Sequence, residues 1–81
     1  MPLKNLDVDR EALELAKDIA AKSGVTYDAI HAAIMMRNDV TTIITEDLHD
    51  WLKIQDAWME IVRKHKLSLG ALEVFAPSRD L

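Results

Sequence analysis

The sequence contains no cysteine, only two glycines and two prolines, and few aromatic residues. Without cysteine the chain has neither disulfides nor thiolate metal sites, which is typical of a cytoplasmic protein. No apolar run approaches the roughly 18 residues that a membrane-spanning helix needs, and the amino terminus has no signal-like pattern. The net charge is −4, so the composition shows no excess of the basic residues that usually accompany nucleic-acid binding. We therefore expect a cytoplasmic protein without membrane contact.

What is present indicates a small globular domain. Hydrophobic residues make up 49% of the 81 residues and charged residues 30%, a balance that favours a packed core over disorder. A chain of this length allows one domain, spanning residues 1–81. Such a domain is of marginal stability because it buries a small fraction of its surface, about 60% at 60 residues.

Two helices are expected in the first half of the chain. After an extended lead-in or short strand from Met1 to Val8, Asp9 is a plausible N-cap of the first helix, and Gly24 ends it. Thr26 is expected to cap the second helix and to place Asp28 in its first turn, where the helix dipole favours the ionised carboxylate. The apolar positions of the first helix recur at helical spacing: Ala12, Leu15, Ala16, Ile19 and Ala20.

The second half alternates strand, helix and strand. Residues 29–36 are apolar nearly all round, which predicts a helix buried among layers. The β-branched run from Val40 to Thr45 predicts a buried, parallel strand. A helical pattern follows from Leu48, as one helix or as two broken near Gln55, and Leu72–Phe75 predicts a last strand. This alternation predicts an α/β fold in which the two strands pair in parallel through a right-handed crossover.

Two acidic residues stand at the ends of apolar elements. Asp28 begins a helix and Asp47 follows the first strand, at the end where open α/β sheets bind ligands. Paired carboxylates suit a hard cation such as Mg²⁺ or Mn²⁺, and shared ligation would place the two groups about 4–7 Å apart. Each acid also has a purely structural interpretation, Asp28 as a stabiliser of a helix start and Asp47 as an N-cap. The structural and metal-binding roles can coexist.

The order of these motifs resembles the carboxyl-terminal part of a PIN domain. The resemblance rests on Tyr27-Asp28-Ala29-Ile30-x-Ala32-Ala33, then the strand, then Thr45-Glu46-Asp47, and it extends from about Leu6 to Pro77. It implies a helix-rich portion of a three-layer α/β/α domain with a small parallel sheet. A PIN domain begins with a strand that ends in an Asp and later supplies a helix-borne acid. Neither precedes Leu6, so the resemblance implies an incomplete domain.

The same resemblance implies a function. PIN domains are metal-dependent ribonucleases, and many are the toxin halves of toxin–antitoxin pairs. By resemblance, Asp28 and Asp47 would be catalytic residues that bind Mg²⁺ or Mn²⁺, with the Thr45 hydroxyl orienting them. The substrate would be RNA, and the partner would be an antitoxin or the missing amino-terminal segment. The roles of Glu46 and His31 stay open, although a satisfied, partly buried side chain is the simpler interpretation of His31.

A second hypothesis is a non-catalytic half-domain that acts as a protein-interaction or oligomerisation module. An unpaired apolar strand edge favours association with another chain, so we expect a homo-oligomer. The side chains expected to fill such an interface are Trp51, Trp58, Ile30, Ile34 and Met35, although the two tryptophans also fit a core. The basic cluster at Arg63–Lys66 suits a helix carboxyl terminus. An antitoxin-like DNA binder is disfavoured by the acidic charge and by the lack of a helix-turn-helix pattern.

Overall fold

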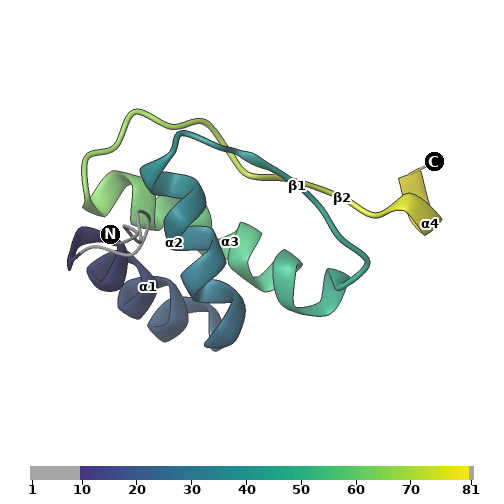
Figure 1. The fold of residues 1–81 in the computed structure, drawn as a ribbon, viewed down its shortest axis with the longest axis horizontal. Helices are drawn as coiled ribbons and strands as arrows, with labels where there is room; N and C mark the ends of the chain where they lie inside the picture. Colours follow the sequence, from purple (N-terminus) through teal and green to yellow (C-terminus); the bar gives the residue numbers. More distant parts are fainter. Residues whose placement is uncertain (1–9, 81) are drawn as a thin grey trace, which may run out of the picture.

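The computed structural model describes residues 10–80, so the predicted lead-in and the Asp9 cap lie outside the described part. Three helices lie against one another beside a short two-stranded sheet, and a single-turn helix follows the sheet (Figure 1). The fold is helix-rich and carries a parallel sheet, as the alternation predicted. The elements in chain order are α1 (Arg10–Ser23), α2 (Tyr27–Arg37), β1 (Thr42–Ile44), α3 (Leu48–Lys64), β2 (Glu73–Phe75) and α4 (Pro77–Asp80).

Helix α1 buries the stripe that its sequence predicts. Ala12, Leu15, Ala16 and Ile19 are buried, and Ala20 is partly buried against the same core. Gly24 ends the helix with a φ of +80°, a conformation that glycine adopts without strain, and its N–H donates to the carbonyl of Ala20 at 2.8 Å. The predicted helix stop at Gly24 is confirmed.

The expected cap of α2 is not formed. Thr26 precedes the helix, but its backbone is itself helical (φ −93°, ψ −51°) and its side chain makes no capping hydrogen bond. A capping residue needs an extended backbone to turn its oxygen toward the free N–H groups, so the prediction for Thr26 is wrong. The connection is held by Ser23 instead, whose hydroxyl accepts the Val25 N–H at 3.1 Å and donates to the Ile19 carbonyl at 2.7 Å.

Helix α3 is one uninterrupted helix of 17 residues, which resolves the choice that the sequence left open. Trp51 and Trp58 are 2% and 0% exposed and lie in the protein's own core, so the prediction that they face a partner chain is wrong. Their core interpretation is confirmed. The Trp58 indole N–H donates to the Gly70 carbonyl at 2.9 Å and thereby fixes the segment that leads into β2.

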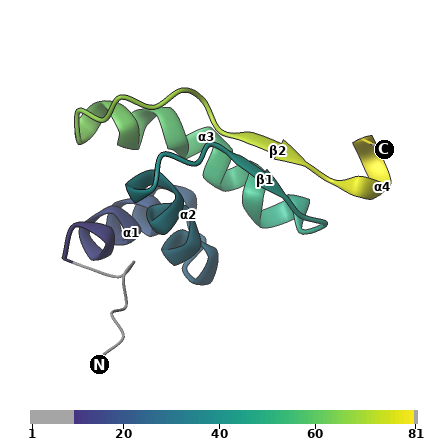
Figure 2. The same ribbon diagram turned by 45° about the horizontal axis from the view of Figure 1, so that its top comes forward.

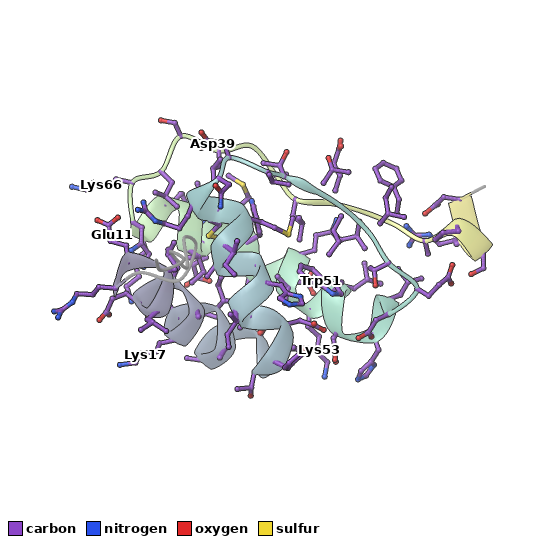
Figure 3. The ribbon with its side chains drawn as sticks, in the orientation of Figure 1. Glu11, Lys17, Asp39, Trp51, Lys53 and Lys66 are labelled. Carbon is purple, nitrogen blue, oxygen red and sulfur yellow. The ribbon has the colours of Figure 1, made fainter. Side chains whose placement is uncertain are left out.

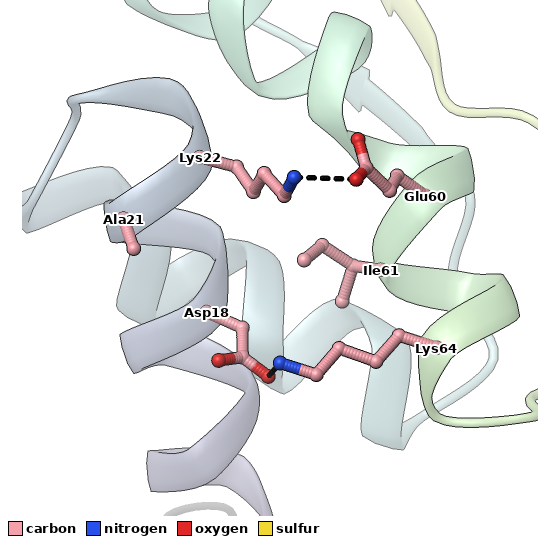
Figure 4. A pocket seen from close by; sticks show the side chains of 6 residues that line it. All are labelled: Asp18, Ala21, Lys22, Glu60, Ile61 and Lys64. Carbon is pink, nitrogen blue, oxygen red and sulfur yellow. Dashed lines mark ion pairs between the residues drawn. The ribbon is translucent and has the colours of Figure 1, made fainter.

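Ion pairs join α1 to α3 across their exposed rims. Lys22 pairs with Glu60, and Asp18 pairs with Lys64 at 3.1 Å (Figure 4). The Asp18 carboxylate also lies 2.7 Å from the ring nitrogen of His65, the C-cap residue of α3. Part of the basic cluster at Arg63–Lys66 therefore serves an intramolecular contact.

The two strands pair in parallel, with Thr42 opposite Glu73 and Ile44 opposite Phe75. One face of the sheet, carrying Val74 and partly buried Ile43, packs on the helical core. The other face is open (Figure 2): Ile44 is 71% exposed and Phe75 43%. The predicted parallel pairing is confirmed, whereas the prediction that β1 is buried is wrong. Within residues 10–80 the helices cover a single face of the sheet, so the arrangement has two layers where the PIN resemblance implies three.

The turn into β1 uses a left-handed residue. Asp39 has a φ of +58°, and it lies where α2 leads into the strand (Figure 3). The Val40 N–H then donates back to the Met35 carbonyl at 2.9 Å, which starts the strand close beside the helix. Among the helices of residues 10–80, none combines the length and the apolar composition that a bilayer crossing requires.

Candidate metal centre

Asp28 is held at the amino-terminal end of α2, in the first turn, as predicted. The next residue, Ala29, is buried against the core, and this packing fixes the start of the helix. The Asp28 side chain is only 15% exposed. A carboxylate that is so far withdrawn from water needs compensating partners, since burial disfavours its charged form.

Asp47 is placed by the end of β1 and the start of α3. The Thr45 hydroxyl oxygen accepts the Asp47 N–H at 3.0 Å, and the Thr45 N–H donates to the Phe75 carbonyl at 2.8 Å. The Asp47 carboxylate accepts the Asp50 N–H at 3.3 Å and caps α3. The N-cap interpretation is therefore confirmed, and Thr45 contacts the backbone of the acid that the resemblance expected it to orient.

The structure brings three carboxylates together. Asp28, Asp47 and Asp50 each present one oxygen, and these oxygens all lie within 4.8 Å of one another. Asp28 and Asp47 therefore lie close to each other, as the sequence indicated. Asp50, which the motif does not include, also belongs to this group. Its position three residues after Asp47, on the first turn of a helix capped by Asp47, is the sequence signal that could have identified it.

The three neighbouring carboxylates repel one another when no cation is bound. Burial, followed by the nearby charges of Asp47 and Asp50, raises the pKa of the Asp28 carboxyl, and the proximity of His31 opposes this shift in part. These effects therefore outweigh the effect of the helix dipole, which was expected to favour the ionised form of Asp28. Like charges this close repel in a partly dehydrated site, and a bound cation would remove the repulsion.

His31 borders the cluster without entering it. Its Nδ1 lies 3.9 Å from the Asp28 carboxylate, beyond hydrogen-bond distance, and its ring lies against Tyr27 with 5.5 Å between ring centroids. The His31 side chain is 55% exposed. The interpretation of His31 as a satisfied, partly buried histidine is therefore wrong.

Glu46 contacts helix α4 and not the acidic cluster. Its carboxylate accepts the Ser78 hydroxyl at 2.6 Å and the Ser78 N–H at 3.0 Å, and these bonds lower the pKa of the Glu46 carboxyl. Glu46 thereby holds the first turn of α4 beside the end of β1. It is neither a fourth acid of the cluster nor simply solvated.

The donor set fits a hard divalent cation. Three carboxylate oxygens from two helix starts meet just past the carboxyl end of a parallel strand, and oxygen-only sites of this kind suit Mg²⁺ or Mn²⁺. Comparisons with protein-family models, with curated proteins and with solved structures found no match. The assignment of a function therefore depends on the geometry and on the motif resemblance.

Proposed function

We propose that this chain is the cation-binding part of a metal-dependent ribonuclease of the PIN type. The observation that carries the proposal is the meeting of Asp28, Asp47 and Asp50 at the end of β1. Two of these acids are the ones that the PIN motif singles out, and Asp50 supplies a third carboxylate. Three carboxylates form a more adequate Mg²⁺ site than two, because Mg²⁺ gives up its waters reluctantly.

The chemistry would be hydrolysis of a phosphodiester bond in RNA. A divalent cation held by the three acids would lower the pKa of a bound water and offset the charge that develops on the phosphate. Burial and the neighbouring acids raise the pKa of Asp28, and a bound cation would favour its ionised form. The resemblance implies three or four carboxylates in a PIN-type site, and the described cluster supplies three. The net charge of −4 makes RNA binding depend on the metal.

Mn²⁺ titration of the full chain, followed by calorimetry, tests the site directly. We expect one saturable binding event at neutral pH that weakens at least tenfold in Asp28→Asn and in Asp50→Asn. Asp56→Asn is the matched control, since it removes the same charge from an exposed position of α3. Equal Mn²⁺ affinity in all four proteins would refute the metal site.

An RNA cleavage assay tests the reaction separately. Single-stranded RNA should be cut in the presence of Mn²⁺, and Asp28→Asn or addition of EDTA should abolish the cutting, while Asp56→Asn should not. Saturable Mn²⁺ binding without any cleavage would favour the second candidate, a non-catalytic interaction module. The observation that supports this alternative is the open face of the sheet at Ile44 and Phe75.

A further inference from the structure

The two outer edges of the sheet differ in the hydrogen bonding of their backbone groups. Along the outer side of β2 and the segment before it, three successive alternate carbonyls each accept a side-chain donor. These bonds are Trp58 to Gly70 at 2.9 Å, Gln55 to Leu72 at 2.9 Å and Arg79 to Val74 at 2.8 Å. The Ala76 N–H donates to the Asp80 carboxylate at 2.9 Å. The β2 edge is thus closed by the protein's own side chains, which protects it from pairing with another strand.

Among the residues that the structure describes, none protects the outer edge of β1 in this way. The Glu73 N–H donates to the Thr41 carbonyl and the Thr45 N–H donates to the Phe75 carbonyl, both at 2.8 Å. Because alternate residues of a parallel strand face its partner, the N–H and C=O groups of Thr42 and Ile44 point to the opposite side. Within residues 10–80, none of these four groups has a hydrogen-bond partner.

The side chains around this edge are uncharged. From Val40 to Thr45 the chain carries no charged residue and no proline. Val40 is 43% exposed and Ile44 71%, and Phe75 extends the apolar surface onto the neighbouring strand. Exposed edge strands are commonly protected by their shortness, by a lysine, by a proline or by a bulge, and β1, with three residues, has only the first of these.

We propose that β1 pairs in antiparallel fashion with β1 of a second copy of this chain, which gives a continuous four-stranded sheet in the order β2-β1-β1-β2. In a two-fold arrangement centred on Ile43, Thr42 of each copy lies opposite Ile44 of the other. Each such pair exchanges two N–H to C=O bonds, so the two free donors and two free acceptors of each copy are all satisfied. The edge is therefore complementary to itself, as a two-fold interface requires.

The charges of the chain permit this pairing. The nearest acid on the sheet, Glu73, lies on β2, so the two Glu73 side chains would be three strand spacings apart, about 14 Å, which exceeds the Debye length of about 8–10 Å. At the ends of the paired strands, Asp39 of one copy approaches Asp47 of the other. Added salt screens this repulsion, and association is expected to strengthen as ionic strength rises. A second neutral strand fits the neutral edge, whereas a charged segment would find no opposite charge along it.

The oligomeric state of the full chain, measured with EDTA present, tests the proposal separately from the metal site, because Asp47 lies near both. Sedimentation from micromolar to millimolar concentration should show a reversible dimer with twice the chain mass of 9.2 kDa. Thr42→Pro removes one outward N–H per copy at the first residue of the strand, a position that tolerates proline. Loss of two symmetric bonds should weaken the dimer about tenfold or more. The matched control Thr42→Val keeps the N–H, loses the same hydroxyl and should still dimerise.

If circular dichroism shows that Thr42→Pro does not fold, a second variant tests the proposal. Ile44→Lys changes an exposed side chain and places two lysines at diagonal positions across the two-fold axis, where the strand positions are about 7–8 Å apart and the like charges repel. It should reduce dimerisation as strongly while leaving the helical signal intact. A wild-type chain that stays monomeric throughout, or a dimer that tolerates the folded edge variants unchanged, would overturn the proposal.

Discussion

The ring nitrogen Nε2 of His65 lies 2.7 Å from the carboxylate of Asp18 and joins the carboxyl end of α3 to the middle of α1. The hydrogen bond from His65, with further help from Lys64, lowers the pKa of the Asp18 carboxyl. This contact spans 47 positions of the sequence and fixes two helices that share the main core.

Replacement of Asp18 by Asn should lower the free energy of unfolding by about 1 kcal/mol at neutral pH, because a partly exposed charged hydrogen bond is lost. Because its pKa is lowered, the Asp18 carboxyl binds a proton less tightly in the folded protein than in the unfolded chain. Its stabilisation is therefore complete above the unfolded pKa and is lost as the pH falls through that value toward the folded pKa. Urea denaturation at several pH values should show a smaller acid-dependent loss in Asp18→Asn than in the wild type, and Asp56→Asn should behave like the wild type.

Asp28→Asn should have the opposite effect on the metal-free protein. The raised pKa means that the folded state binds the Asp28 proton more tightly than the unfolded state, so ionised Asp28 lowers stability at neutral pH. This cost diminishes as the pH falls through the folded pKa. The variant should melt at a higher temperature than the wild type at pH 7 without metal. It should gain less from added Mn²⁺, which stabilises the wild type by preferential binding to the folded state. A lower melting temperature for the metal-free variant would contradict the electrostatic assignment.

Two substitutions of Asp47 separate its structural and ionic roles. Asp47→Asn retains an oxygen that can accept the Asp50 N–H, so helix α3 should keep its cap and its stability. Asp47→Ala removes the cap and should cost about 1 kcal/mol. Both variants should lose Mn²⁺ affinity, because both lack the charge. Denaturant unfolding and calorimetry on the same preparations provide the comparison, and unchanged Mn²⁺ affinity in Asp47→Asn would exclude this acid as a ligand.

Thr45→Val should weaken Mn²⁺ binding without altering the cluster's charge. The Thr45 hydroxyl accepts the Asp47 N–H at 3.0 Å and thereby sets the turn that places the carboxylate. Loss of a group that orients a metal ligand typically costs about 10- to 100-fold in affinity. Calorimetric titration measures the effect, with Thr42→Val as the matched control on the same strand. Equal affinities in the two variants would show that the turn is held without the hydroxyl.

Local patterns predicted much of this fold. Gly24 as a helix stop, the apolar stripe of α1 and the parallel pairing of β1 with β2 all follow from short-range spacing and the order of elements. The exposure of β1 could not be predicted in this way. A β-branched run indicates a strand that can be buried, but it does not indicate whether another part of the chain covers that strand. Ile44 and Phe75 lie in the open for that reason.

The candidate site was predictable in part for a related reason. Asp28 and Asp47 stand at element ends that are visible in the sequence, and the structure brings them together. Asp50 lies inside the next helix and resembles any solvated acid until the Asp47 cap fixes the turn that carries it. The raised pKa of Asp28 depends on the sum of burial and neighbouring charge, which only the three-dimensional arrangement supplies.

The parallel register of the sheet has a consequence for the order of folding. The side chains of Thr42 and Glu73, which face each other across the two strands, are 31 positions apart in the chain, and all of α3 lies between them. Parallel strands cannot form a local hairpin, so this pairing must await the closure of a long loop. Contacts between α1 and α2 are much closer in sequence and can form earlier. We therefore expect amides of β2 to gain protection from hydrogen exchange after those of the helices, and to lose it first when the protein opens.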